Sequence, residues 1–151
     1  MLKITKKNTK LFLEDCQKLN IIKPDIICKA TDHIPQMLKL IQKLKEGGYT
    51  YESDTAVYFD ISKDKHYGEL AHLKLEDLEA GARVEVDPKK KNALDFVLWF
   101  KAVGKYKNHV MQWDSPNGRG FPGWHVECSA MSMQYLGEQF DIHTGGSDLI
   151  P

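Results

Sequence analysis

The chain has 151 residues, with 21 Lys and Arg against 21 Asp and Glu, and its hydrophobic and aromatic fractions are 42% and 10%. This length suffices for one domain with a core, and the composition excludes a disordered chain. No apolar run reaches the roughly 20 residues of a membrane helix, and no signal-peptide stretch follows the basic N-terminus. Zero net charge argues against a protein built mainly to clamp nucleic acid.

Charge and cysteines are unevenly placed along the chain. Residues 1–30 contain seven lysines and three acidic residues, whereas residues 121–151 contain four acidic residues and no Lys or Arg. Cys16, Cys28 and Cys128 form neither a disulfide framework nor a C-x-x-C zinc motif. The cysteine pattern therefore predicts a cytoplasmic protein, where thiols stay reduced.

The first third of the chain predicts two helices. Apolar residues recur at helical spacing up to Leu19, and Pro24 is expected to mark the exit from the first helix. In the second helix, Thr31 is the expected N-cap, Pro35 lies in the first turn and Gly47-Gly48 ends the element. An apolar stripe on this helix predicts packing against a core; it is formed by Ile34, Met37, Leu38, Ile41 and Leu44.

The middle third has the pattern of a small α+β module. Apolar and aromatic runs predict strands, and a leucine pattern predicts one short helix. The expected strands are residues 49–51, 56–59, 83–87 and 94–100, and the short helix covers residues 73–78.

The last third begins with a Gly- and Pro-rich loop over residues 114–123. A helix should follow, with Trp124, Cys128, Met131 and Tyr135 on one face and Gly137 as its C-cap. Residues 140–143 then predict a strand that runs into a glycine turn. Helix, strand and turn in this order indicate part of an α/β layer, in which ligands gather where strands end.

Residues 123–128 concentrate reactive side chains, and three interpretations compete. His125-Val126-Glu127 matches the H-x-E of zinc deaminases, but no later cysteine completes that metal site, so this interpretation fails. Cys128 is alternatively a metal ligand, with His125 on the same helical face and further ligands from outside the chain. The structural alternative is a buried cysteine beside a packing tryptophan on an amphipathic helix.

A second candidate site follows the expected strand. His143 precedes Gly145-Gly146, where missing side chains let the backbone approach a ligand, and Asp148 is placed to bind a ribose or an amine. A lone G-G-x-D pattern is more often a simple turn, so this motif alone is weak evidence for a ligand-binding site.

Together these residues resemble the core of cysteinyl-tRNA synthetases. The run "PGWHVECSAMSMQYLGEQFDIHTGGSDLIP" carries the resemblance, and "TDHIPQMLKLIQKLKEGGYTYE", "VYFD", "YGEL", "GARVEVD", "DFVLWF" and "WDSP" precede it in the family's order. The resemblance implies an α/β fold: part of a class I synthetase Rossmann-type catalytic domain that carries an inserted α+β connective-peptide module. It implies a helical segment at 1–48, the insertion at 49–120, and the start of the second catalytic half at 121–151.

The resemblance also implies a site and its ligands. The family holds Zn²⁺ with two Cys, one His and one Glu, and Cys128 matches the second cysteine. Trp124 and His143 match positions that line the cysteine pocket, while Gly145, Gly146 and Asp148 match the loop that contacts ATP. The two ATP-binding signature motifs of the class, HIGH and KMSKS, are absent from the chain.

The resemblance therefore implies a central fragment of a cysteine–tRNA ligase, inactive in isolation and without a catalytic residue of its own. The parent enzyme would use L-cysteine, ATP with Mg²⁺ and tRNA(Cys), with no membrane and no stable protein partner. Zinc would select cysteine over serine because it prefers a soft thiolate to a hydroxyl. Four positions depart from the family pattern: Lys29, Phe100, Phe121 and Thr144.

Two rival functions stay open at this point. One is the related ligase that joins cysteine to an amino sugar in mycothiol synthesis, although the Lys-rich composition fits poorly with the GC-rich genomes expected to encode it. The other is a free-standing connective-peptide-like module that binds RNA or a protein partner through the basic residues 1–30.

Overall fold

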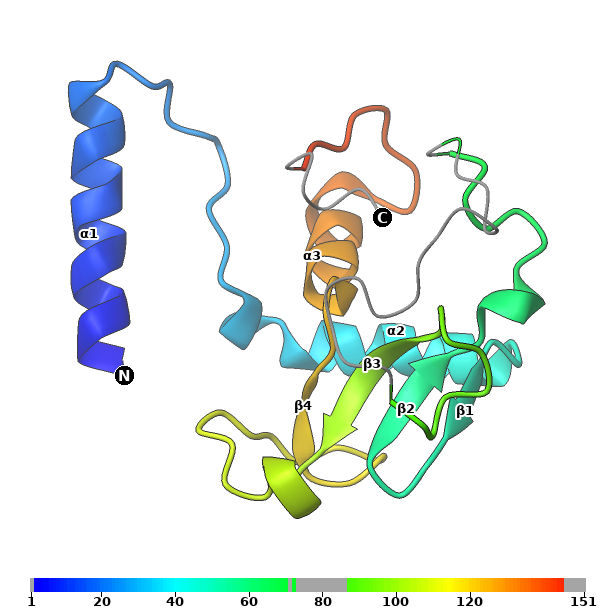
Figure 1. The fold of residues 1–151 in the computed structure, drawn as a ribbon. Helices are drawn as coiled ribbons and strands as arrows, with labels where there is room; N and C mark the ends of the chain where they lie inside the picture. Colours follow the sequence, from blue (N-terminus) through cyan, green and yellow to red (C-terminus); the bar gives the residue numbers. More distant parts are fainter. Residues whose placement is uncertain (1, 71, 73–86, 146–151) are drawn as a thin grey trace.

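The computed structural model describes residues 2–70, 72 and 87–145, which form three α-helices and one antiparallel sheet (Figure 1). The described residues thus mix helix and strand, as the sequence predicted. Among them, no helix combines the length and the hydrophobicity needed to cross a membrane. The expected helix at 73–78 and most of the strand at 83–87 lie outside the described residues.

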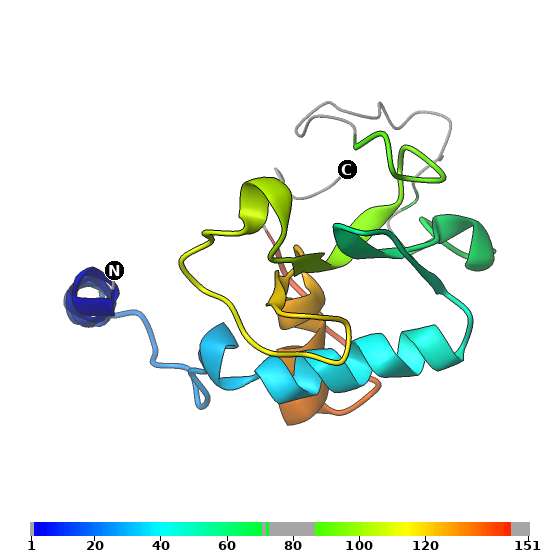
Figure 2. The ribbon, with the colours of Figure 1, turned by 90° about the horizontal axis from the view of Figure 1, so that it is seen from below.

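Helix α1 (Leu2–Lys18) stands apart from the other elements in both ribbon views (Figures 1 and 2). The prediction that it runs toward Pro24 is wrong. Asn20 adopts a left-handed conformation with φ 56°, and the Ile21 N–H bonds to the Cys16 carbonyl oxygen at 3.0 Å. This bond closes a Schellman motif, which ends the helix because asparagine tolerates the left-handed region.

Helix α2 (Ile34–Glu46) follows a 3₁₀ turn over Ala30–Asp32. The prediction of Thr31 as the N-cap is wrong, because that residue lies in the 3₁₀ turn and His33 occupies the N-cap position. The helix ends at Gly47, as expected, and Gly48 continues with φ 78°.

The His33 ring is buried and connects α2 to the C-terminal helix instead of capping its own helix. Its Nδ1–H donates to the Lys29 carbonyl oxygen at 2.7 Å, and its Nε2 lies 2.7 Å from the Tyr135 hydroxyl. Because the carbonyl can only accept, neutral His33 must receive the Tyr135 proton at Nε2.

Among the described residues, the sheet has four antiparallel strands in the order β1 (Thr50–Glu52), β2 (Ala56–Phe59), β3 (Phe96–Lys101) and β4 (Gly120–Pro122). The first three lie where strands were predicted, whereas β4 occupies the end of the predicted loop. The tight β1–β2 turn is held by Ser53, whose hydroxyl oxygen accepts from the backbone N–H groups of two following residues at 3.1 Å.

Helices α2 and α3 (Val126–Leu136) lie on the same side of the sheet and bury its core (Figure 2). The helix α3 was predicted, although Trp124 precedes it rather than lying on its face. In the part of the chain that the structure describes, ten residues form the core cluster: Ile34, Met37, Ile41, Val57, Phe59, Ile61, Leu98, Trp99, Val126 and Ala130. Each large apolar side chain in it stabilises the fold by about 1.5–3 kcal/mol.

The predicted strand at 140–143 is wrong. Residues 139–145 have neither helical nor strand conformation, and Ile142 is 78% exposed. A strand needs a neighbour that supplies backbone hydrogen bonds, and within the described residues no strand pairs with this segment. Its alternating pattern therefore has no sheet to join in the described part of the chain.

The division into segments 1–48, 49–120 and 121–151 stays a prediction. The core cluster takes residues from all three segments, since Met37, Val57 and Val126 pack in it together. The sheet spans Thr50 to Pro122, so it largely coincides with the expected insertion.

Candidate functional site

The candidate site lies where β4 leads into α3, and two glycines set its position. A Cβ atom on Gly120 would stand 1.8 Å from the Phe100 carbonyl oxygen, and one on Gly123 would stand 1.8 Å from the Val97 carbonyl oxygen. Only glycine allows so close an approach of β4 to β3. The Gly123 N–H then bonds to the Leu98 carbonyl oxygen at 2.9 Å, which fixes the backbone immediately before the reactive segment.

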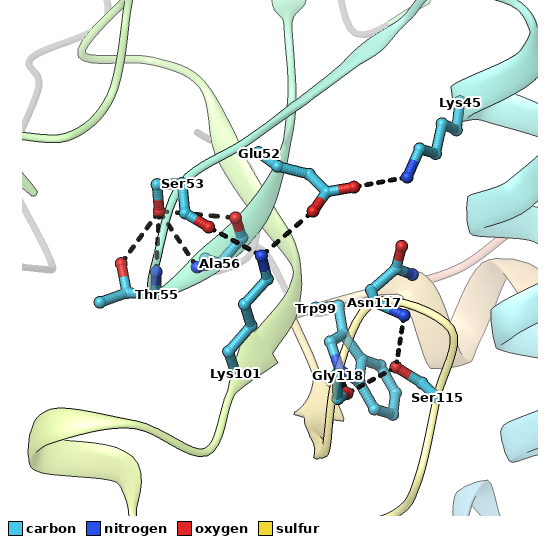
Figure 3. Close-up of polar contacts among 10 residues, drawn as sticks. All are labelled: Lys45, Glu52, Ser53, Thr55, Ala56, Trp99, Lys101, Ser115, Asn117 and Gly118. Carbon is cyan, nitrogen blue, oxygen red and sulfur yellow. Dashed lines mark hydrogen bonds and ion pairs between the residues drawn. The ribbon is translucent and has the colours of Figure 1, made fainter.

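The loop that enters β4 is held by its own hydrogen bonds (Figure 3). The Trp99 indole Nε1–H and the Ser115 hydroxyl both donate to the Gly118 carbonyl oxygen, at 3.1 and 2.7 Å. Trp113 and Gly120 exchange two backbone hydrogen bonds of 2.7 and 2.9 Å. The buried Trp99 thus connects this loop to the core.

A second polar group stabilises the sheet beside this loop (Figure 3). Glu52 on β1 accepts from Lys45 at the end of α2 and from Lys101 at the end of β3, the latter at 3.1 Å. Hydrogen bonds from Lys45 and then Lys101 hold the pKa of the Glu52 carboxyl below its usual range. The Lys101 ammonium also donates to the Ser53 carbonyl oxygen at 2.8 Å.

Trp124 and His125 form the turn between β4 and α3. His125 has φ 69°, a left-handed conformation that is uncommon outside glycine. The Trp124 indole Nε1–H donates to His125 Nε2 at 2.6 Å, and the two rings are nearly perpendicular at 89°. Trp124 is 70% exposed, so its ring is presented to solvent or to a ligand.

An apolar pocket of about 180 Å³ opens beside this turn. Helix α2, strands β2 and β3 and the start of α3 all contribute to its wall. The sequence pattern did not identify it, because its walls come from four separate elements. The side chains around it include Leu40, Leu44, Phe59, Phe96, Leu98 and Trp124.

Cys128 lies in the first turn of α3 and is exposed, so the structural alternative of a buried cysteine is wrong for this residue. Partial loss of hydration and the neighbouring Glu127 carboxylate raise the pKa of the Cys128 thiol above its ordinary value. Glu127 is half-buried, and within the described residues its Oε2 atom has no hydrogen-bond partner. The sequence motif does not reveal this oxygen, because neither its burial nor its missing partner can be seen in the residue pattern.

The second candidate site is only partly described. His143 is exposed and its ring centroid lies 6.0 Å from that of Phe140, and Gly145 is also exposed. Gly146 and Asp148 lie outside the described residues. The described part of the chain therefore gives no geometry for the expected ATP-binding loop.

The described residues offer one donor of the expected zinc site. Across residues 2–70, 72 and 87–145, no group of three or more His, Cys, Asp or Glu side chains is arranged to hold a metal ion. The His125 Nε2 atom is occupied by the Trp124 indole. The donors present thus fit one position of a thiolate zinc site, through Cys128, but not a complete site.

Two of the four departures from the family pattern are neighbours in the sheet. Phe100 on β3 pairs directly with Phe121 on β4, and their rings stack with centroids 5.0 Å apart. Tyr106 packs on both rings, and His109 stacks on Phe121 at 3.8 Å. Phe100 and Phe121 therefore belong to one aromatic cluster.

Comparison with known proteins places these features in a family. The family model described as the class I (C) tRNA synthetase catalytic domain matches residues 1–151. The chain is 55% identical over 150 residues to the cysteine–tRNA ligase of Treponema denticola, with 99% of this chain and 30% of the relative covered.

Other relatives give the same result. The cysteine–tRNA ligase of Pyrococcus horikoshii is 51% identical over 148 residues, with 98% of this chain and 30% of the relative covered. The cysteine–tRNA ligase of Methanococcus maripaludis is 49% identical over 146 residues, with 97% of this chain and 30% of the relative covered. The chain thus spans about 30% of the length of these relatives. On the match over its whole length, the chain belongs to the family of class I (C) tRNA synthetase catalytic domains.

Proposed function

We propose that this chain is the central part of a cysteine–tRNA ligase, which activates L-cysteine with ATP and transfers it to tRNA(Cys). The observation that carries the proposal is the match of the whole chain to the synthetase catalytic domain, with relatives about half identical that are named cysteine–tRNA ligases. Trp124, which is expected to line the cysteine pocket, and Cys128, which is expected to hold zinc, lie within one short segment at the end of the sheet.

In this proposal Trp124 forms a wall of the cysteine pocket. Its exposed ring stands at the rim of an apolar pocket, which suits contact with the substrate's sulfur-bearing side chain. His143 would complete the pocket, and Gly145, Gly146 and Asp148 would contact ATP, which enters with Mg²⁺. The nucleotide-binding half, with its Rossmann-type strands, would begin near residue 121.

Cys128 would hold Zn²⁺ together with ligands from outside these 151 residues. When bound, the ion supplies a soft acceptor that prefers a thiolate to a hydroxyl, which is the difference between cysteine and serine. Cys128 itself must lose its proton to become a ligand, and its raised pKa means that the thiol is protonated at neutral pH without a metal. Zinc binding at this position would therefore release a proton.

The direct test places the chain in a complete enzyme. In a chimera, these 151 residues replace the matching segment of the Treponema denticola ligase, to which they are 55% identical. We expect the chimera to charge tRNA(Cys) with cysteine, because it restores the flanking parts of the catalytic domain. A folded chimera that charges no tRNA(Cys) would overturn the proposed function.

The zinc proposal has its own test. We expect the purified chimera to contain about one zinc ion per chain, and its Cys128→Ser variant to lose most of it. Cys16→Ser is the matched control, since that cysteine lies on α1 and should not affect zinc content. Equal zinc in the Cys128→Ser variant would contradict the role of Cys128.

The isolated chain should be inactive. The described residues carry one zinc donor, and no HIGH or KMSKS signature is present in the sequence. We therefore expect the 151-residue chain alone to show no cysteine-dependent exchange of pyrophosphate into ATP and to bind zinc weakly. Measurable exchange by the isolated chain would contradict this expectation.

A further inference from the structure

Trp124 is largely exposed for a residue proposed to line a pocket. It is 70% exposed and lies between the end of β4 and the start of α3. Gly123 fixes the backbone before it, but glycine has no side chain to support the indole. An exposed aromatic side chain with two free torsions would otherwise sample several rotamers.

The His125 ring supplies the restraint. Its Nε2 atom accepts the indole N–H at 2.6 Å, and the rings meet edge to face with centroids 5.5 Å apart. Both the direction of the hydrogen bond and the perpendicular ring geometry define one orientation of the indole. With Nε2 as the acceptor, neutral His125 carries its proton on Nδ1.

The backbone of His125 connects this restraint to α3. The His125 carbonyl oxygen accepts from the Ser129 N–H at 3.0 Å, which is the first hydrogen bond of the helix. Its left-handed φ of 69° occurs at the last of the three residues that connect β4 to α3. The ring that orients Trp124 is thereby attached to the same helical turn that carries Cys128.

We propose that His125 is a positioning residue, which orients the Trp124 indole relative to Cys128 and so shapes the pocket for the cysteine side chain. This inference rests on the proposed function, because it assumes that Trp124 contacts cysteine. His125 also borders the apolar pocket, and in this proposal it acts through Trp124.

The experiment is a double-mutant cycle in the chimera described above. His125→Gly removes the acceptor but keeps a residue that adopts positive φ easily, so backbone strain is not confounded with the lost hydrogen bond. Trp124→Phe keeps an aromatic ring but removes the donor. Gln134→Ala, an exposed position on α3, is the matched control. Far-UV circular dichroism melts check that each variant folds.

We expect His125→Gly to raise the KM for cysteine in ATP–pyrophosphate exchange by roughly fivefold, the effect of one neutral hydrogen bond. The KM for ATP should change less than about twofold, a split that general damage to the fold would not produce. The double variant should have a KM for cysteine only slightly higher than that of the more impaired single variant, because both substitutions remove the same interaction.

Two results would overturn the inference. One is an unchanged KM for cysteine in His125→Gly, and the other is a double variant whose loss equals the product of the two single losses. Failure of the proposed function is distinguishable, because the unmodified chimera would then show no cysteine-dependent exchange at all, and this inference would fall with it.

Discussion

Substitution of Gly123 by alanine tests the close approach of β4 to β3 that positions the candidate site. The added Cβ would lie 1.8 Å from the Val97 carbonyl oxygen and 2.5 Å from its carbonyl carbon. Both are backbone atoms of a central strand and cannot rotate away. Ordinary contact distances require β4 to withdraw by about 1.5 Å.

That displacement breaks a specific hydrogen bond. The Gly123 N–H lies 2.9 Å from the Leu98 carbonyl oxygen, and a shift of this size takes the pair beyond hydrogen-bond range. The backbone at Gly123 and at Leu98 is buried, so two polar groups lose their partner at a cost of about 1–3 kcal/mol each. We therefore expect Gly123→Ala to lower the free energy of unfolding by about 2–6 kcal/mol.

The assay is urea denaturation of the 151-residue chain, followed by far-UV circular dichroism. Gly48→Ala is the matched control: its Cβ would meet no atom within 4 Å, but its φ of 78° is strained for alanine. That variant should lose only about 1 kcal/mol. If Gly123→Ala loses no more free energy of unfolding than Gly48→Ala, the claim that only glycine lets β4 lie this close to β3 is wrong.

Three further predictions concern charged and reactive side chains. Glu52→Gln should destabilise the chain at neutral pH, because it removes the attraction of the carboxylate to Lys45 and Lys101. The difference from the unmodified chain should vanish as the pH falls through the lowered pKa of Glu52, because protonation removes the same attraction. A difference in melting temperature that stays constant with pH would contradict this. Asp95 is fully buried and accepts hydrogen bonds from the Tyr51 hydroxyl and two backbone N–H groups. Asp95→Ala should therefore lower the free energy of unfolding, measured by urea denaturation, by about 3–5 kcal/mol. A loss below about 1 kcal/mol would contradict a stabilising role for this carboxylate. The rate at which iodoacetamide alkylates Cys128, measured by peptide mass spectrometry, should still rise with pH above 9.0, the ordinary pKa of the thiol. A rate that reaches its plateau below that pH would contradict the raised pKa.

The sequence predicted the elements whose pattern is local. The stripe from Ile34 to Leu44 predicts a helix because its apolar residues recur at separations of three and four positions, and α2 buries Ile34, Met37 and Ile41 as expected. The β-branched and aromatic run at 56–59 is likewise buried throughout β2. Both signals are carried by neighbours in the chain and need no knowledge of the rest of the fold.

Features that depend on distant residues could not be predicted. The strand expected at 140–143 has the right alternation, but pairing depends on a partner that the pattern itself does not specify. The stacking of Phe100 on Phe121 requires the register of β3 with β4, although each residue had been identified as a departure. The same holds for the hydrogen bond between His33 and Tyr135, which are 102 positions apart.

The candidate site was predicted in its composition but not in its geometry. The motif around Trp124 and Cys128 was recognised from its residue types, yet the left-handed φ of His125 and its hydrogen bond to the indole are properties of the folded turn. Glycine at 123 was expected to be part of a loop. Its actual role is steric, and it becomes evident only when the Val97 carbonyl is found against it.

The measurement that tests the central claim most directly is amino-acid-dependent ATP–pyrophosphate exchange by the chimera, with cysteine and serine compared at equal concentrations. We predict exchange with cysteine and a kcat/KM for serine lower by at least about a hundredfold, since a pocket built around a thiolate-binding group rejects the hydroxyl analogue strongly. Exchange with neither amino acid, or equal exchange with both, would contradict the claim that this chain belongs to an enzyme that selects cysteine.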